Sequence, residues 1–180
     1  MSTARRLFAE RGYANVSAAE IVSAAGLTRG ALYHHYADKK ALFQAVLIEL
    51  DDELIDQIGA AMRDAGSTEL GMVAAVSAYL DLCSRPEVVR LVLTDAPAVL
   101  GWHEWRAIEA EHGLGLIREM LVPAQREGKV VGSVDLLAQL ILSAVTEAAL
   151  YVAHAENTEQ AKEEARIGLL TLLGGALRAG

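Results

Sequence analysis

The sequence predicts an all-α fold of about nine helices. Three observations predict this class. Apolar residues recur at spacings of three and four along most of the 180-residue chain, which is the period of an amphipathic helix. No segment alternates apolar and polar residues between turn signals, as a half-buried strand would. Prolines, which interrupt helices, number only three in the whole sequence.

Four helices are predicted at the start of the chain, each with its own start or stop signal. They cover residues 3–11, 18–25, 29–35 and a long segment from residue 39 onward. The signals are N-caps at Ser17, Thr28 and Asp38 and helix-ending glycines at Gly12 and Gly26. Ser17 and Glu20 have the spacing of a capping box. Because Gly26 suits a left-handed turn, we expect Leu27 after it to point inward.

The later helices are predicted from the same signals. Starts are expected at Ser67 or Thr68, at Ser84 with Glu87, at Ser133 with Asp135, and at Asn157 or Thr158. Pro97 and Gly101 bound shorter pieces, and a helix from about residue 102 is expected to reach about residue 125, with a kink at Pro123. The charge balance changes inside the long fourth helix. We therefore expect two domains, residues 1–47 and 48–180, joined by that helix.

Composition and charge limit the possible functions. Apolar residues make up 53% and charged residues 22%, enough for a sizeable core. The net charge is −8, yet residues 1–50 hold six Lys and Arg against four Asp and Glu. Cys83 is the only cysteine, so we expect no disulfide and a cytoplasmic setting. We also expect no bound cofactor. The apolar stretch 136–153 contains Glu147, which favours a buried helix over a membrane span.

The segment 18–35 predicts a helix-turn-helix. Two short helices that cross sharply need a left-handed residue between them, and Gly26 supplies it. Gly30 leaves the start of the second helix thin enough for its backbone to approach DNA. Arg29, early in that helix, is the candidate for a guanine contact. The candidates for phosphate contacts are Tyr33, His34 and Lys39.

Residues 4–47 resemble the DNA-binding domain of TetR-family transcriptional repressors. The matching features are "LFAERGY", the Ser17 cap, "AEIVSAAGL" and "GALYHHYADKKAL". The resemblance implies a homodimer that binds double-stranded operator DNA, represses genes and leaves the operator when a small ligand binds the C-terminal domain. By position it implies phosphate contact at the helix that Ser17 opens, base reading by Thr28, Arg29 and Gly30, and backbone contact by Tyr33, His34 and Lys39. Only residues 1–3 precede the pattern, so we expect a longer, more basic form to bind DNA more tightly.

Other residues invite other functions. His34 and His35 are adjacent on a helix and point about 100° apart, which disfavours a shared metal ion. The segment "GWHEWRAIEAEHG" (101–113) has histidines and a glutamate but no HExxH motif or nucleophile pattern, so we expect no enzyme. Its tryptophans pack in a core or at a subunit surface, or they form one wall of a ligand cavity. The candidate ligand-binding residues are Tyr79, Asp95, Trp102, Trp105, Arg106, Glu147 and Tyr151.

The last two predicted helices are typical of an oligomer interface. The first is apolar nearly all round and so needs cover on more than one side. The candidate interface residues are Leu137, Ile141, Ala144, Ala148, Ala165, Leu169, Leu172, Leu173 and Ala176. The alternative is the core of a monomer, and Glu147 fits either the ligand cavity or the dimer seam. Two further functions stay open: an all-helical protein-interaction module and a transcriptional activator of the same fold.

Overall fold

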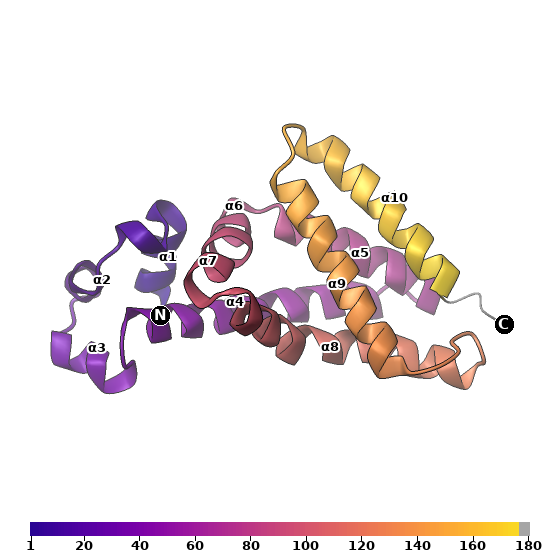
Figure 1. Cartoon of the computed structure of the whole chain (residues 1–180), viewed down its shortest axis with the longest axis horizontal. Helices are drawn as coiled ribbons and strands as arrows, with labels where there is room; N and C mark the ends of the chain where they lie inside the picture. The colour runs from indigo at the N-terminus through magenta and orange to yellow at the C-terminus, as the bar shows by residue number, and fades with distance from the viewer. Residues whose placement is uncertain (177–180) are drawn as a thin grey trace. The chain divides into compact units, whose positions relative to one another are not determined.

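The computed structural model describes residues 1–176, apart from the side chains of Thr68 and Ala176, and contains helices but no strand in this range. The α-helices are α1 (Ser2–Arg11), α2 (Ala18–Ala24), α3 (Arg29–His35), α4 (Lys39–Arg63), α5 (Thr68–Cys83), α6 (Pro86–Val88), α7 (Ala96–Leu100), α8 (Trp102–Arg126), α9 (Val134–Ala153) and α10 (Thr158–Ala176) (Figure 1). A 3-10 turn (Tyr13–Asn15) follows α1, and a π-helical segment (Val89–Asp95) joins α6 to α7. The prediction of an all-α protein with about nine helical runs is confirmed.

Contacts divide the chain into two compact units. The first consists of Met1–Asp51 and Arg85–Arg106, and the second consists of Asp52–Ser84 and the chain from Ala107 onward. The boundaries therefore fall inside α4 and α8. The segment 85–106 thus packs with the N-terminal helices, which charge balance along a sequence does not report, and the division into domains at residue 47 stays a prediction.

The first unit is built around an aromatic cluster from the N-terminal helices. Phe8 of α1 and Phe43 of α4 are fully buried, and their rings meet edge to face at 5.3 Å between centroids. Tyr13 packs against both, at 5.7 Å from Phe8 and 4.9 Å from Phe43. Such pairs add about 0.5–1.5 kcal/mol beyond the burial of their area. This cluster fixes α1 against the start of α4 and supports the shorter helices.

Local signals set the ends of α2 and α3. Ser17 and Glu20 form the predicted capping box. Gly26 has φ of +64°, and the amides of Gly26 and Leu27 donate to the carbonyls of Ser23 and Val22, which is a Schellman motif. The prediction that Leu27 points inward is wrong, since its side chain is 54% exposed. The hydrogen-bonded turn and the burial of Ile21 are enough to fix the crossing of the two helices without it.

Three carboxylates of the segment 85–106 bind it to the N-terminal helices within the first unit; we call them the carboxylate clamps. Glu87 accepts two hydrogen bonds from Arg5, from Nε to Oε1 at 2.7 Å and from Nη2 to Oε2 at 3.0 Å. Asp95 Oδ2 accepts from the Tyr13 amide at 2.7 Å. The two carboxylate oxygens of Glu104 accept from Lys40 Nζ at 2.8 Å and from Gln44 Nε2 at 3.0 Å. The Arg5 hydrogen bonds lower the pKa of Glu87 below its usual value. Charge-assisted bonds of this kind are stronger than neutral ones.

The segment that leads into the first clamp corrects one prediction. Ser84 does not cap a helix start; it ends α5, and its hydroxyl donates to the Asp81 carbonyl at 2.8 Å. The helix begins instead at Pro86, with Arg85 in an extended conformation as its N-cap. Proline disfavours the helical conformation of the residue before it and suits the first helical position itself, so Pro86 decides the start.

The second unit is a bundle of α5, α9, α10 and the remaining parts of α4 and α8. In it α9 and α10 lie side by side, and α10 also packs on α5 (Figure 1). Its core is aliphatic, with fully buried Leu80 and Leu121 among its members. The predicted cap at Ser133 is present, where the hydroxyl accepts from the Leu136 amide. Asn157 caps α10 by accepting from the Gln160 amide at 3.2 Å.

Helix α9 is the one helix among the described residues that is long and apolar enough to cross a membrane. Its mean hydropathy is 1.7 over the most apolar window, and a third of that window is buried inside the structure. Buried positions such as Thr146 and Ala149 pack within the unit. The exposed part carries large aliphatic side chains, which need cover of some kind.

Candidate functional site

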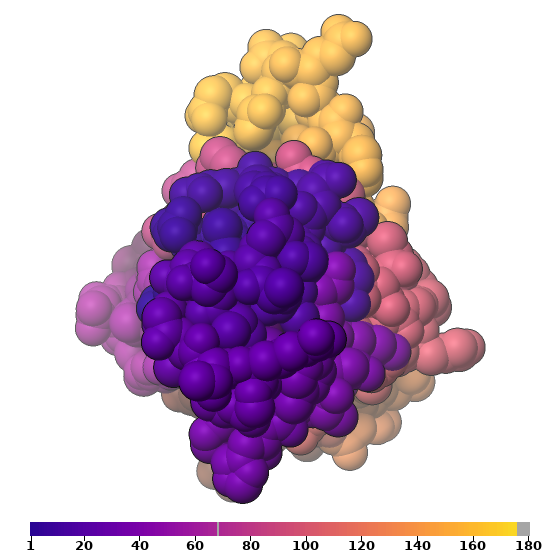
Figure 2. All heavy atoms as spheres, turned by 90° about the vertical axis from the view of Figure 1, so that its left-hand side faces the viewer, coloured from indigo at the N-terminus to yellow at the C-terminus, as the bar shows by residue number. Residues whose placement is uncertain are grey.

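The start of α3 is an exposed, slender helical end. Thr28 caps it by accepting from the Ala31 amide at 3.2 Å. Arg29 and Gly30 are exposed, and a side chain added at Gly30 would meet no atom within 4 Å. Leu32 of α3 is buried and packs the helix against the rest of the first unit. Figure 2 faces this part of the first unit, where the indigo and purple atoms of the N-terminal helices form one continuous surface.

Donor side chains surround this helical end. The Arg29 guanidinium carbon lies 5.6 Å from the centroid of the Tyr33 ring, one helical turn later. A cation–π contact of this kind is worth about 0.5–1 kcal/mol at an exposed site and limits the directions that Arg29 samples. Tyr33, His34 and His35 are all exposed, and the two histidine rings meet edge to face at 5.2 Å. The arrangement can present donors to the edges of bases and to phosphates.

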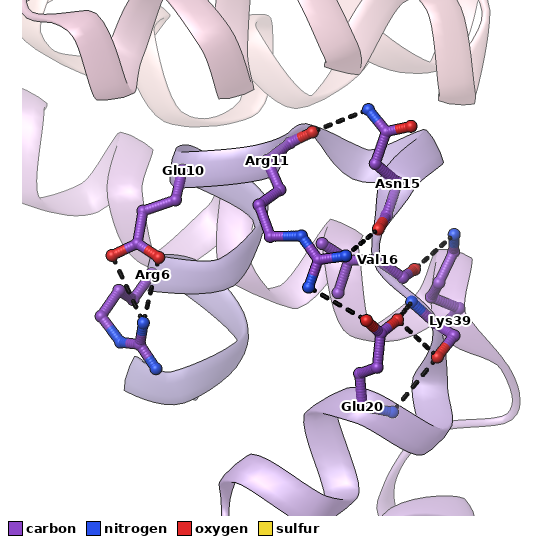
Figure 3. A network of polar contacts seen from close by, with 8 residues as sticks. Arg6, Glu10, Arg11, Asn15, Val16, Glu20 and Lys39 are labelled. Atoms are coloured by element: carbon purple, nitrogen blue, oxygen red, sulfur yellow. Dashed lines mark hydrogen bonds and ion pairs between the residues drawn. The ribbon is translucent and has the colours of Figure 1, made fainter.

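Ser17 sits in a polar network at the start of α2 (Figure 3). Its amide and its hydroxyl both donate to Glu20 Oε2, at 2.8 and 2.7 Å. Arg11 lies 3.0 Å from Glu20 Oε1, and Figure 3 shows these two side chains pointing toward each other. Hydrogen bonds from Ser17 and then Arg11 lower the pKa of Glu20 to about 2. The serine hydroxyl proton is therefore used inside the capping box. An incoming phosphate would compete with Glu20 for it.

Lys39 is placed inside the first unit. Its ammonium donates to the carbonyls of Tyr13 and Val16, at 2.9 and 3.0 Å, and lies 3.8 Å from the centroid of the Tyr13 ring. Figure 3 shows it reaching back toward the turn that precedes α2. The Tyr13 carbonyl also accepts from the Val16 amide at 3.4 Å, so Lys39 adds a second donor to Tyr13 and supplies one to Val16. The sequence pattern indicated a phosphate donor, and the geometry shows a group that fastens this turn to α4.

An apolar cavity of about 90 Å³ lies inside the second unit. Its walls come from α4, α5, α8, α9 and α10, and they are Ile55, Ile58, Met62, Met72, Ala75, Val76, Tyr79, Gly113, Leu116, Ile117, Met120, Ile141, Leu142, Val145 and Leu173. Within the described part of the chain, Tyr79 is the only lining side chain with a hydroxyl, amide or charged group. Burial, more than any nearby group, raises the pKa of Tyr79 well above its usual 10.

The other candidate ligand-binding residues do not line this cavity. In the second unit, Glu147 and Tyr151 are exposed, and the Tyr151 hydroxyl donates to Glu164 at 2.6 Å. Both residues belong to α9 and lie on its solvent-exposed face. Sequence reasoning expected them to share a cavity with Tyr79 because helical spacing does not fix which side of an almost wholly apolar helix faces inward.

The remaining candidates belong to the first unit. Asp95 serves as a carboxylate clamp on Tyr13, and Arg106 is partly buried at the end of the segment. Trp102 is exposed and meets the buried ring of Trp105 edge to face, at 5.1 Å. Trp105 Nε1 has no hydrogen-bond partner among the described atoms. Trp105 therefore packs in the core, which agrees with the core-packing alternative. A part for Trp105 in ligand binding stays a prediction.

An apolar groove of about 190 Å³ runs between α9 and α10. It is lined by Leu137, Leu140, Ile141, Ala144, Val145, Leu169, Leu172 and Leu173, which include most of the predicted interface residues. Leu140 and Leu172 are 58% and 63% exposed. Ala148 and Ala165 are partly buried against the core next to it, and the side chain of Ala176 lies outside the described residues.

Two family comparisons cover most of the chain. Residues 1–46 match "Bacterial regulatory proteins, tetR family", and residues 70–176 match "Tetracyclin repressor-like, C-terminal domain". The second match alone spans more than half of the sequence. The chain belongs to the TetR family. The helix-turn-helix of the first unit and the helical bundle of the second are thus the two parts of a TetR-family regulator.

Relatives of this TetR-family chain include proteins named as transcriptional regulators. The HTH-type transcriptional repressor Rv1474c of Mycobacterium tuberculosis is 36% identical over 107 residues, which cover 56% of this chain and 53% of that protein. The HTH-type transcriptional activator FasR of Mycolicibacterium smegmatis is 33% identical over 78 residues, covering 43% and 36%. This chain thus aligns with only about half of Rv1474c and less of FasR.

A solved structure extends the likeness to nearly the whole chain. A TetR-family transcriptional regulator from Pectobacterium atrosepticum has a TM-score of 0.85 and 36% identity, covering 98% of this chain and 91% of that one. No group of three or more His, Cys, Asp or Glu residues is placed to hold a metal within the part of the chain that the structure describes. The family match, the fold and the exposed start of α3 all indicate a helix-turn-helix protein of the TetR family.

Sequence reasoning missed the carboxylate clamps and the methionine-lined cavity. Glu87 and Glu104 carry no signal, because each meets a partner more than 60 positions away in the sequence. The methionines gave a weak signal for the cavity. Three of the four methionines, all except Met1, line it, and a flexible side chain suits a site that must adapt.

Proposed function

We propose that this chain is a DNA-binding transcriptional repressor that acts as a homodimer and is released from its operator by a small molecule. The observation that carries the proposal is the exposed start of α3, where Arg29 projects beside the bare Gly30. A helix end of this form fits the major groove, and an arginine there pairs with guanine through two hydrogen bonds. Such a regulator works in the cytoplasm, where it meets its DNA.

An Arg29→Ala variant tests the base-reading role. We expect it to lose about 1–3 kcal/mol at one base position of the operator, with relaxed preference there. Binding would be measured on duplexes that differ by single base pairs, starting from a duplex selected from random sequence by the full chain. Arg126→Ala removes the same charge from an exposed site in α8 and should leave base preference unchanged. An equal loss on every duplex would make Arg29 a phosphate contact instead.

The second copy of the chain is the proposed occupant of the groove between α9 and α10. Leu140 and Leu172 line it and remain more than half exposed, and the neighbouring Leu136 is 62% exposed. Exposed aliphatic side chains gathered on two adjacent helices mark an interaction surface. Two copies are also needed because a palindromic operator presents its half-sites about 34–36 Å apart, or a multiple of this.

A Leu172→Glu variant tests the dimer. Burying two copies of the new carboxylate in an apolar interface is costly, so we expect the dimer dissociation constant to rise at least about 100-fold. Sedimentation equilibrium measures it. Val131→Glu, at a highly exposed loop position, is the matched control and should leave the dimer intact. A monomeric wild-type chain would contradict the proposal, and so would a Leu172→Glu variant that stays dimeric.

The effector is proposed to bind in the apolar cavity of the second unit. Helix α4 is continuous from Lys39 to Arg63, so it contributes residues both to the DNA-binding unit and to the cavity wall. A ligand shifts the balance between two conformations only when it binds one of them more tightly. Release of the operator thus requires that the cavity differ between the DNA-bound and the released state.

Activation of transcription is the alternative that a comparison favours, because the relative FasR is named an activator. The two functions differ in the sign of the effect, which transcription in vitro from a promoter that carries the selected operator measures directly. A protein-interaction module without DNA binding is the third possibility. It predicts that no duplex is selected at all and that Arg29→Ala has no effect on any partner.

A further inference from the structure

We infer that the effector is a neutral, apolar small molecule that carries no charged group. This rests on the proposed effector role of the second unit and names the chemical class that its cavity accepts. Among the residues that the structure describes, the cavity walls are aliphatic side chains, three of them methionines, together with Tyr79, and none of these wall residues is charged. A charged ligand placed there would lose its water without gaining a partner, which costs several kcal/mol.

Among the described wall residues, Tyr79 carries the one hydroxyl. Burial raises the pKa of Tyr79 well above its usual 10, so this group stays neutral and supplies no charge to a ligand. The nearby Thr146 is buried, and its hydroxyl donates to the Leu142 carbonyl at 2.8 Å. Thr146 does not line the cavity. The described wall therefore offers a ligand an aromatic ring and aliphatic surface.

The size and the flexibility of the walls set the scale of the ligand. The cavity measures about 90 Å³ in this structure. A dry cavity of about 150 Å³ lined by aliphatic and aromatic side chains binds benzene. Met62, Met72 and Met120 are unbranched and change rotamer at low cost, so they can enlarge the space. A single hydrocarbon ring with a small alkyl substituent is the expected fit.

The test uses toluene as the probe and its charged counterparts benzoate and benzylammonium as matched controls. Isothermal titration calorimetry on the full chain measures binding. We expect toluene to bind saturably and benzoate and benzylammonium to bind at least about 100-fold more weakly, as the cost of burying an unpaired charge requires. Tighter binding of either charged probe overturns the inference. Failure of all three to bind overturns it as well.

Cavity variants locate the binding. Ala75 lines the cavity on α5, whereas Ala74 beside it does not. Filling the space with Ala75→Leu should weaken toluene binding at least about tenfold, while Ala74→Leu should change it less than about twofold. If the larger side chain prevents folding, Gly113→Ala replaces it, with Gly115→Ala on the same helix as control. An added methyl at Gly113 would lie 3.1 Å from Leu142 Cδ1, and at Gly115 it would meet nothing within 4 Å.

Removing the only wall hydroxyl separates this inference from a polar ligand. Tyr79→Phe should leave toluene binding within about twofold, because toluene has no group that could hydrogen-bond to the hydroxyl. If Tyr79→Phe abolishes binding of toluene, the inference fails. Release of the operator is measured apart, by fluorescence anisotropy of the selected duplex. Toluene that binds as expected without releasing DNA overturns the proposed effector role and supports the assignment of the cavity to neutral apolar molecules.

Discussion

The two units of this chain hold their distant segments together by different interactions. In the first unit, carboxylates of the segment 85–106 bind cations and an amide of the N-terminal helices, in addition to apolar packing. Arg5 and Glu87 form a pair joined by two hydrogen bonds, and both side chains are partly buried, at 20% and 34% exposed. In the second unit the helices meet mainly through aliphatic side chains, and ion pairs between them, such as Arg63–Glu119 and Arg118–Asp135, have exposed partners. Its Lys162–Asp81 pair leaves Asp81 68% exposed, so it contributes little.

The difference matches what each unit is proposed to do. Hydrogen bonds depend steeply on distance and angle, so the carboxylate clamps favour one geometry of the DNA-binding helices. Aliphatic contacts are non-directional, and a core with methionines can repack around a ligand at low cost. A DNA-binding unit needs one orientation of its helices, whereas a unit that responds to a ligand needs at least two conformations. The following predictions test that comparison.

The largest effect is expected from the second unit. Leu121 is completely buried in the aliphatic core. Leu121→Ala should lower the free energy of unfolding by about 2–5 kcal/mol, through lost burial and the cavity it leaves. Urea unfolding measures this loss, and it should be the same at low and high NaCl. A loss that shrinks with salt would contradict the description of this unit as aliphatic.

Lys39→Met should have the next largest effect, in the first unit. The substitution keeps the length of the side chain but removes the ammonium that donates to the carbonyls of Tyr13 and Val16, so we expect a loss of about 2 kcal/mol in unfolding free energy. Urea unfolding gives the loss, and operator binding at several salt concentrations gives the second readout. A phosphate contact predicts the reverse: unchanged stability and a salt slope reduced by about one.

A smaller effect is expected at a carboxylate clamp. Glu104→Gln keeps the shape of the side chain and its hydrogen bond to Gln44, but it removes the charge that Lys40 meets at 2.8 Å. Both partners of the ion pair are more than a third exposed, so the loss should be at most about 1 kcal/mol. It should fall further as NaCl is raised. A loss that does not respond to salt would place Glu104 among purely packing residues.

The smallest effect concerns acid and the capping box of α2. The folded-state pKa of Glu20 is lowered from 4.5 to about 2 by its hydrogen bonds to Ser17, so this stabilisation is complete above the unfolded value. It is lost as the pH falls from about 4.5 toward about 2. Wild type and Glu20→Gln should therefore converge in stability over that range. A difference between them that stays constant with pH would contradict the assignment.

Much of the fold follows from local signals in the sequence. The capping box at Ser17, the cap at Ser133 and the left-handed Gly26 lie where the sequence places them, because each acts over four residues or fewer. The wrong predictions arose where a sequence pattern was present but did not decide the structure. Ser84 has the spacing of a helix cap, but Pro86, two residues later, sets the start of the helix. Leu27 follows the turn glycine, but the turn forms without burying it.

The candidate site divides in the same way. The exposed end of α3 is readable from Thr28, Arg29 and Gly30, since all three belong to one helical turn. The internal role of Lys39 is not, because its carbonyl partners are more than 20 positions earlier in the chain. Nor does the sequence show that Tyr79 lines the cavity while Glu147 faces outward.

The sequence by itself determined the all-α class, the ends of most helices and the helix-turn-helix. These depend on periodicity, caps and turns, whose energies arise between near neighbours. Only the tertiary structure decided that the segment 85–106 packs with the N-terminal helices, that Lys39 fastens a turn, and which side chains enclose the apolar cavity. Those outcomes depend on contacts between residues far apart in the chain, and neither helical spacing nor charge balance specifies which faces will meet.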